Sequence, residues 1–137
     1  MIATYPLPAY VQRFFTERLL TQMQASPNTI ASYRDTFRLL LKYAAAETNL
    51  PPTDLHVAHI DADIVGRFLT FCEDERGNSA RSRNTRLAAI RSFFKYVAGS
   101  EPHLLHHCQK VLAMPSKRHE KRVVDFLNRG EMELLLK

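Results

Sequence analysis

One short segment of this 137-residue chain concentrates side chains that bind anions. Between Gly77 and Ser100 there are five basic residues and no acidic one, and arginine stands at positions 81, 83 and 86 among Ser, Asn and Thr. If a helix begins here, its first turn presents free backbone N–H groups and a partial positive charge, and both favour phosphate. Arginine and asparagine also hydrogen-bond to base edges in a major groove. The residue types therefore predict binding of a polyanion.

The alternative reading of this segment is an ordinary solvated helix start. Such starts usually carry Asp and Glu, because each cation there opposes the helix dipole at a cost of roughly 0.3 kcal/mol or more. Three arginines in the first turns therefore favour a binding role. We expect Arg83 and Arg86 to be exposed, so that reversing their charges changes stability little.

A weaker version of the same pattern begins at Ser26. Residues 26–34 read SPNTIASYR, and a basic residue recurs at positions 34, 38 and 42. On a helix this spacing of four places the three cations on one side. The signal is weaker because Asp35 dilutes the charge, and because the Asn and Thr at positions 28 and 29 can simply cap the helix.

The charge of +5 is unevenly distributed along the chain. Residues 1–75 hold six Lys/Arg and nine Asp/Glu (net −3), residues 76–122 hold eleven and two (net +9), and residues 123–137 hold two and three (net −1). A surface that is merely lysine-rich would spread its charge more evenly. The concentration is typical of a face that binds a polyanion.

The remaining composition bounds the class of protein. Apolar residues make up 45% of the chain, which excludes a disordered protein and suits one domain with its own core. No apolar run is long enough for a membrane helix, and the first residues, MIATYPLPAY, predict no secretory leader. We therefore expect no membrane partner. Cys72 and Cys108 stand in no paired motif, so we expect a reducing, cytoplasmic location.

Apolar periodicity and turn residues predict an all-α fold with no strands. We expect a first helix over residues 8–24 with Met23 facing inward, and a second from Pro27 to before Asn49. The further expectations are a third helix capped by Asp61 or Asp63 with Phe71 facing inward, a fourth that starts at Ser79 or Ser82 and stops at a left-handed Gly99, and a fifth over 103–113.

The segment after Pro115 differs from the helices. Residues 116–122 read SKRHEKR, which is polar and charged and has no apolar anchor. We therefore predict a helical domain over 1–115 and a basic linker over 116–125. Asn128 and Glu131 then form a capping-box pattern ahead of an apolar run, so residues 126–137 are expected to begin a second, truncated domain.

Two of these segments resemble a known family. The pattern SPNTIxxYRxxF over residues 26–37 resembles the second helix of the core-binding domain of tyrosine recombinases, the phage-integrase family. The run SxNxRLAAIRSFFKY over residues 82–96 is similar to the fourth helix, and residues 128–136 are similar to the start of the catalytic domain. The resemblance implies a SAM-like orthogonal bundle of four to five helices that forms half of a clamp on duplex DNA.

The resemblance also implies which residues touch DNA, since helices two and four face it in that family and a basic linker follows. Carried over position by position, and joined with Arg81 from the basic segment, the candidate contacts are Asn28, Thr29, Ser32, Arg34, Arg38, Arg81, Ser82, Arg83, Asn84, Arg86, Arg91, Lys117, Arg118, Lys121 and Arg122. The implied partners are double-stranded DNA and, in the full-length protein, other recombinase protomers.

The family's catalysis uses an arginine and histidine constellation around a tyrosine nucleophile in the second domain. We therefore expect no catalytic residue and no enzyme activity in this chain, although its full-length parent would be a recombinase. Tyr33, Tyr43 and Tyr96 fall at or beside helical core positions, and we interpret them as packing residues.

Other chemistry is weakly supported. His103, His106, His107 and Cys108 offer metal ligands at helical spacing, but one such cluster near a helix end favours surface histidines, and we predict no metal and no cofactor. Two other classes of function remain open. A stand-alone helix-turn-helix regulator would also be basic and helical, but the second and third expected helices are too far apart for the tight turn of that motif, and the fourth has no short partner before it. A helical protein-interaction module would show no salt-dependent affinity for DNA.

Overall fold

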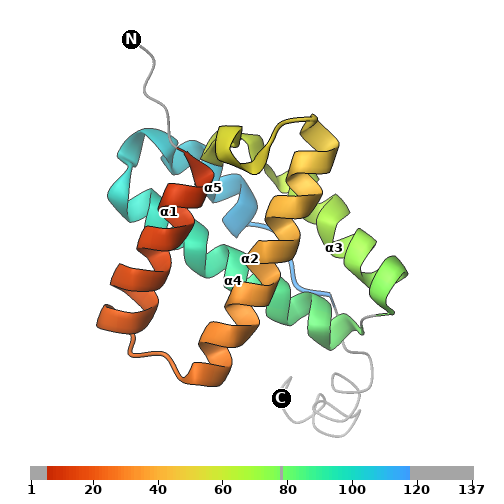
Figure 1. Ribbon diagram of the computed structural model, residues 1–137, viewed down its shortest axis with the longest axis horizontal. Coiled ribbons are helices and arrows are strands. Elements are labelled where there is room, and N and C mark those ends of the chain that lie inside the picture. Colours follow the sequence, from red (N-terminus) through yellow and green to blue (C-terminus); the bar gives the residue numbers. More distant parts are fainter. Residues whose placement is uncertain (1–5, 78, 118–137) are drawn as a thin grey trace, which may run out of the picture.

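The computed structural model describes residues 6–77 and 79–117, with the side chain of residue 76 left aside. Nine helical segments follow one another in this part of the chain (Figure 1). They are α1 (Leu7–Arg13), the π-helix η1 (Phe14–Gln22), α2 (Pro27–Thr48), the short 3₁₀ helices η2 (Pro52–Asp54) and η3 (Val57–His59), α3 (Ala62–Arg76), α4 (Ala80–Ser100), the 3₁₀ helix η4 (Pro102–Leu104) and α5 (Leu105–Leu112). The predicted all-α fold of four to five main helices is confirmed.

The longer helices begin where hydroxyl or carboxylate side chains cap them. Ser26 Oγ accepts a hydrogen bond from the Thr29 amide at 3.2 Å and so opens α2. Asp61, and not Asp63, caps α3 by accepting from the Ile64 amide at 2.8 Å. In the same way Ser79, and not Ser82, caps α4. Each cap satisfies an amide that has no partner within the helix.

Two helices end in left-handed residues, but not at the glycine that we predicted. Asn49 closes α2 with φ 58° and Gly77 closes α3 with φ 64°, and both residue types tolerate this conformation. The prediction that α4 stops at Gly99 is wrong, since α4 continues through Ser100. The Glu101 amide bonds to the Val97 carbonyl and Pro102 opens the next helix, so the chain turns without a left-handed residue.

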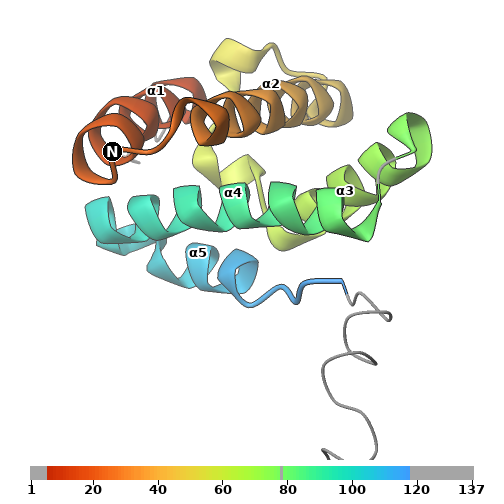
Figure 2. The same ribbon diagram turned by 90° about the horizontal axis from the view of Figure 1, so that it is seen from below.

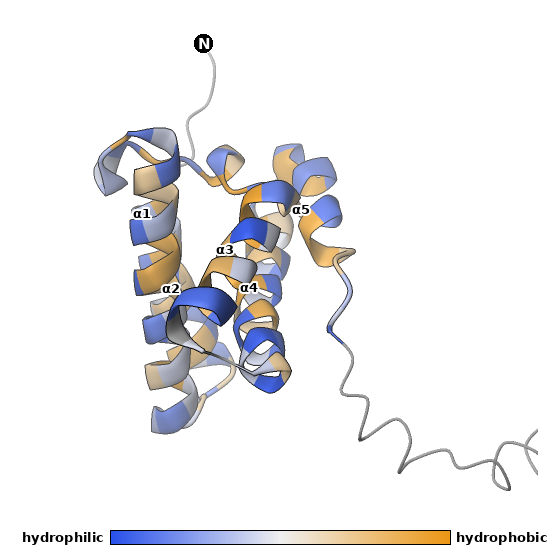
Figure 3. Ribbon diagram, turned by 90° about the vertical axis from the view of Figure 1, so that its right-hand side faces the viewer, coloured by the Kyte–Doolittle hydropathy of each residue, from blue (hydrophilic) through white to orange (hydrophobic). Residues whose placement is uncertain are grey.

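The helices pack in layers around α4. Figure 2 shows α1 and α2 in one layer over α4, with α3 beside α4 and α5 on its opposite side. Hydrophobic and hydrophilic residues alternate around each helix, as expected of helices with one face in a core (Figure 3). The largest fully buried side chains include Phe14, Phe68, Phe93 and Phe94. α4 therefore supplies the centre of the bundle, and its position fixes the helices on both sides.

An aromatic cluster joins the first helix to α2 and α4. The ring of Phe37 lies 6.0 Å from the rings of both Phe14 and Phe15, and the ring of Phe93 lies 5.5 Å from that of Phe14. Neighbouring residues diverge less on a π-helix than on an α-helix, because each turn holds more residues. The π winding that begins at Phe14 therefore lets two successive phenylalanines face α2.

Two predicted core residues are exposed. Phe71 is 43% exposed, because Phe68, Leu69 and Cys72 form the buried stripe of α3 and position 71 lies outside it. Its ring instead lies 5.2 Å from that of Tyr43. Met23 is 50% exposed, since the first helix ends at Gln22 and its side chain lies beyond the core.

Both cysteines are buried, and neither forms a disulfide bond within the described residues. Burial raises the pKa of the Cys108 thiol to about 11, which makes it a poor nucleophile at neutral pH. Within the described residues, the structure contains no helix long and apolar enough to cross a membrane.

Candidate nucleic-acid interface

The amino-terminal halves of α2 and α4, which contain the two polar segments singled out in the sequence, lie next to each other. A hollow of about 240 Å³ separates them, lined by Ser32, Asp35 and Thr36 of α2 and by Arg81, Ser82, Thr85 and Arg86 of α4. Both helices point their amino ends toward the lower side of the bundle in Figure 1. Two segments about fifty residues apart in sequence therefore form one surface, which is the candidate interface.

An ion pair holds the two helix starts together. Arg86 Nη1 lies 3.3 Å from Asp35 Oδ2, and only 11% of the Arg86 side chain is exposed. The Arg86 Nε atom is buried without a hydrogen-bond partner. The expectation that Arg86 is exposed is therefore wrong, because packing of α4 against α2 covers it.

Arg83 is also committed within the protein. Its Nη1 atom lies 2.7 Å from Glu73 Oε1 on α3, and its side chain is only 19% exposed, contrary to our expectation. The second oxygen of the same carboxylate accepts a hydrogen bond from Lys117 Nζ at 2.8 Å. The hydrogen bonds from Lys117 and then Arg83 hold the pKa of Glu73 below its ordinary value, against the opposing effect of desolvation.

Asn84 binds the chain where it leaves α5. Its Nδ2 donates to the Lys117 carbonyl at 2.8 Å, and its Oδ1 accepts from the Lys117 amide at 2.7 Å. Further along α4, toward its carboxyl end, Arg91 Nη1 lies 3.5 Å from Ser116 Oγ. These two residues therefore contact the segment that follows the bundle, and not only solvent.

Three arginines among the predicted DNA contacts remain accessible, Arg81 at the hollow between α2 and α4 and the other two on the side of α2 that faces the first helix. Arg34, Arg38 and Arg81 are exposed, and within residues 6–77 and 79–117 no ion pair or side-chain hydrogen bond engages their guanidinium groups. Asn28 is exposed as well, whereas Ser32 is half-buried at the hollow and the Thr29 hydroxyl bonds to Ser26 Oγ. These groups keep their hydrogen-bonding capacity available to a ligand.

A second hollow lies between the first helix and α2. It has a volume of about 390 Å³, and its lining is mostly apolar, with Val11, Phe15 and Phe37 among its residues. Arg34 and Arg38 lie at this hollow. Their aliphatic stems can cover apolar surface while the charged heads stay in water, which is usual for long cationic side chains.

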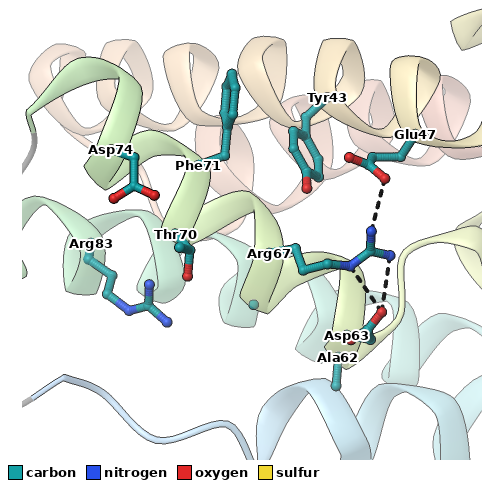
Figure 4. Close-up of a pocket in the computed structure, with 10 residues that line it drawn as sticks. Tyr43, Glu47, Ala62, Asp63, Arg67, Thr70, Phe71, Asp74 and Arg83 are labelled. Atoms are coloured by element: carbon teal, nitrogen blue, oxygen red, sulfur yellow. Dashed lines mark hydrogen bonds and ion pairs between the residues drawn. The ribbon is translucent and has the colours of Figure 1, made fainter.

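A third hollow, of about 630 Å³, is lined mainly by α3, with Tyr43 and Glu47 of α2 and Arg83 of α4 (Figure 4). Arg67 lies 2.9 Å from Glu47 and 3.0 Å from Asp63, so the charges at one end are mutually paired. Phe71 and Asp74 line the other end. This hollow contains one predicted contact, Arg83, whose charge Glu73 already neutralises.

Two tyrosine hydroxyls and His107 have partners within the protein. Burial raises the pKa of Tyr96, and its hydroxyl donates to Glu17 at 2.6 Å. The Tyr10 hydroxyl donates to Glu101. His107 Nε2 bonds to the Ile60 carbonyl at 2.8 Å, while Cys108 is fully buried. Among the described residues, no three His, Cys, Asp or Glu side chains gather in a metal-binding arrangement.

Three residues of this region were not among the predicted contacts or partners. Thr85, which belongs to the polar residues of the basic segment, lines the hollow between α2 and α4, and its place four residues after Arg81 was a usable signal. Asp35 was noted only as diluting charge, and Glu73 was not noted. Neither partner is identifiable from spacing, because each ion pair joins two different helices. Arg118, Lys121 and Arg122 lie outside the described residues and stay predictions.

Comparison with known proteins identifies relatives of this chain. Residues 12–99 match the family described as phage integrase, N-terminal SAM-like domain. The integrase/recombinase y4rC of Sinorhizobium fredii (strain NBRC 101917 / NGR234) is 48% identical over 130 residues, which are 95% of this chain and 39% of that protein. The tyrosine recombinase XerC of Pseudomonas savastanoi pv. phaseolicola (strain 1448A / Race 6) is 31% identical over 91 residues, which are 66% of this chain and 27% of that protein.

The matched regions cover most of this chain and only part of each relative. The chain spans less than half the length of the relatives it matches, and no solved structure matches it significantly. The matched family region nevertheless runs from α1 to the end of α4 and includes both helix starts. The chain therefore belongs to the phage integrase family, as its N-terminal SAM-like domain.

Proposed function

We propose that this chain is the DNA-binding part of a site-specific tyrosine recombinase and grips duplex DNA as half of a clamp. The observation that carries the proposal is the meeting of the amino-terminal halves of α2 and α4 at one hollow. Arg81 and the hydroxyls at this hollow, together with the exposed Arg34 and Arg38 on the neighbouring side of α2, offer groups suited to phosphate and to base edges. The family and the relatives named as recombinases support a role in recombination.

The residues predicted from the sequence fall into three groups. The accessible group meets DNA directly through charge-assisted hydrogen bonds to phosphate, or through polar contacts to bases. It comprises Asn28, Thr29, Ser32, Arg34, Arg38, Arg81 and Ser82, to which we add Thr85 because it lines the same hollow as Ser32 and Arg81. The second group, Arg83, Asn84, Arg86, Arg91 and Lys117, supports this surface through intramolecular contacts, while Arg118, Lys121 and Arg122 extend it along the linker.

The chemistry of recombination belongs in this proposal to the second domain of the full-length protein. A tyrosine there would attack the DNA phosphate, and other protomers would assemble on the same DNA in the cytoplasm. The chain described here contributes binding and no strand cleavage. None of its five tyrosines is proposed as a nucleophile.

Fluorescence anisotropy with a labelled duplex, titrated at several salt concentrations, tests the proposal. We expect weak binding with modest sequence preference, because half of the clamp is missing. The logarithm of the affinity should fall linearly with the logarithm of salt concentration, by about 0.9 for each phosphate neutralised. Absence of a complex at low salt with every duplex, including the native site, would contradict the proposal and favour a protein-interaction module. A covalent protein–DNA adduct would contradict the assignment of catalysis to the second domain.

A further inference from the structure

The segment that leaves α5 follows a defined path over two other helices. Met114 packs against α3 at Gly66, where a Cβ atom would lie 3.8 Å from the Met114 Cε atom. The chain then passes Pro115 and reaches Lys117 at a hollow lined by α3 and α4 residues, Glu73 and Arg83 among them. Figure 2 shows this segment running from α5 toward the amino end of α4. The segment that follows α5 therefore stays in contact with the bundle as far as Lys117.

The attachment at Lys117 uses both its backbone and its side chain. Asn84 engages the carbonyl and the amide of Lys117 together, at 2.8 and 2.7 Å, and so replaces the backbone partners that a helix or strand would supply. Glu73 accepts from Lys117 Nζ, and Arg83 holds the other oxygen of that carboxylate. Three helical side chains thus fix one residue that lies outside any helix.

We infer that Asn84, Glu73 and Arg83 form an anchor that sets the direction in which the chain leaves the helical domain. This inference rests on the proposed function, because the segment so directed would be the basic linker to the second half of the clamp. Asn84 is then a positioning residue: it fixes Lys117, the residue from which the cations of the linker continue, and it does not itself touch DNA. The same anchor keeps the charges of Arg83 and Lys117 on Glu73 and away from phosphate.

Trypsin cleavage of the whole chain tests whether the anchor exists. Trypsin must take the Lys117 side chain and extended backbone into its own site, which the anchor opposes. Loss of two hydrogen bonds in Asn84→Ala should therefore raise the cleavage rate after Lys117 by about tenfold. Cleavage after Lys110, within α5, should not change, because it reports unfolding of the bundle. Thr85→Ala is the matched control, since the Thr85 hydroxyl bonds to the Arg81 carbonyl and not to the linker.

A double-mutant cycle on DNA binding separates positioning from direct contact. Asn84→Ala is measured in the native chain and in a chain with Arg118, Lys121 and Arg122 all changed to Gln. If Asn84 positions the linker, its replacement should weaken duplex binding roughly two- to tenfold in the native chain and not at all with the neutral linker.

The outcomes of the two experiments distinguish positioning by Asn84 from direct contact with DNA and from a general loss of structure. Equal loss of affinity in both chains would show that Asn84 contacts DNA itself and would overturn the inference. Unchanged cleavage after Lys117 in Asn84→Ala would show that no anchor exists, and parallel acceleration at Lys110 would show a general loss of structure instead. If no DNA complex forms with any variant, the proposed function fails, while the cleavage rates still decide whether the anchor exists.

Discussion

The amino-terminal halves of α2 and α4 differ in how many of their arginines are exposed and unpaired, and the order is the reverse of what their sequences suggest. The α4 segment has the denser cluster of cations, yet Arg83 and Arg86 are largely covered and ion-paired. The α2 segment has the weaker pattern, yet Arg34 and Arg38 are exposed and have no ion-pair partner within the described residues. The helix with the denser cluster of cations in the sequence, α4, therefore has more of those cations paired with carboxylates of the protein itself.

This contrast shows that the number of charges in a segment does not measure how many are available to a ligand. A cation that already pairs with a carboxylate must exchange one anion for another when it binds phosphate, so its net gain is small. An unpaired, exposed arginine gives up only its hydrogen bonds to water when it binds phosphate. We therefore expect α2, together with Arg81, to supply more of the DNA affinity than the rest of the basic segment of α4.

The largest expected effect comes from reversing the two accessible charges of α2. Arg34→Glu with Arg38→Glu should lower duplex affinity by about tenfold or more at low salt and should make the salt dependence less steep by about two units of slope. The melting temperature should change little, because both side chains are exposed. Anisotropy titrations and thermal unfolding measure the two quantities.

The control for this pair changes formal charge equally at a distance from the candidate interface. Arg13→Glu with Lys110→Glu serves this purpose, since both residues are exposed on other helices. Arg18 is less suitable, because its Nε atom is buried. Equal loss of affinity in the two double variants would reduce the candidate interface to a diffuse basic surface.

An intermediate effect is expected on stability at the ion pair between α2 and α4. Arg86→Glu places two carboxylates together at a mostly buried position and should lower the free energy of unfolding by about 1–3 kcal/mol. Arg81→Glu, at an exposed and unpaired position of the same helix, should change it by less than about 0.5 kcal/mol. Urea denaturation of both variants checks this, and the swap Asp35→Arg with Arg86→Glu should recover part of the loss. Similar stability of Arg86→Glu and Arg81→Glu would mean that the pair contributes nothing to the fold.

The smallest expected effect is the pH dependence at Glu73. Hydrogen bonds from Lys117 and Arg83 lower its pKa in the folded domain, so the carboxylate binds fewer protons folded than unfolded in acid. Its contribution to stability is thus complete above its ordinary pKa of 4.5 and is lost as the pH falls through the lower folded value. Glu73→Gln should therefore be less stable than the native chain at pH 7, and the difference should shrink toward pH 3. A difference that is constant with pH would contradict the proposed role of this carboxylate.

The amino-acid sequence by itself determined the helical architecture and the location of the basic segment. Apolar spacing and capping residues act within a few positions of each other, so the start of α2 at Ser26 and the capping of α4 by serine could be predicted. The same local signals were less exact where geometry depends on neighbouring helices. The end of α4 beyond Gly99 and the π winding of the first helix are examples.

Only the tertiary structure decided which of the predicted contacts are free. The Arg86–Asp35 pair spans 51 positions and the Asn84–Lys117 contact spans 33, so no local spacing rule connects them. Helix packing brings these residues together, and burial then decides whether a side chain can also reach solvent. Sequence periodicity reports the face of one helix, whereas partner choice depends on two helices and the angle between them. The list of polar residues was therefore available from the sequence, but their division into surface and support was not.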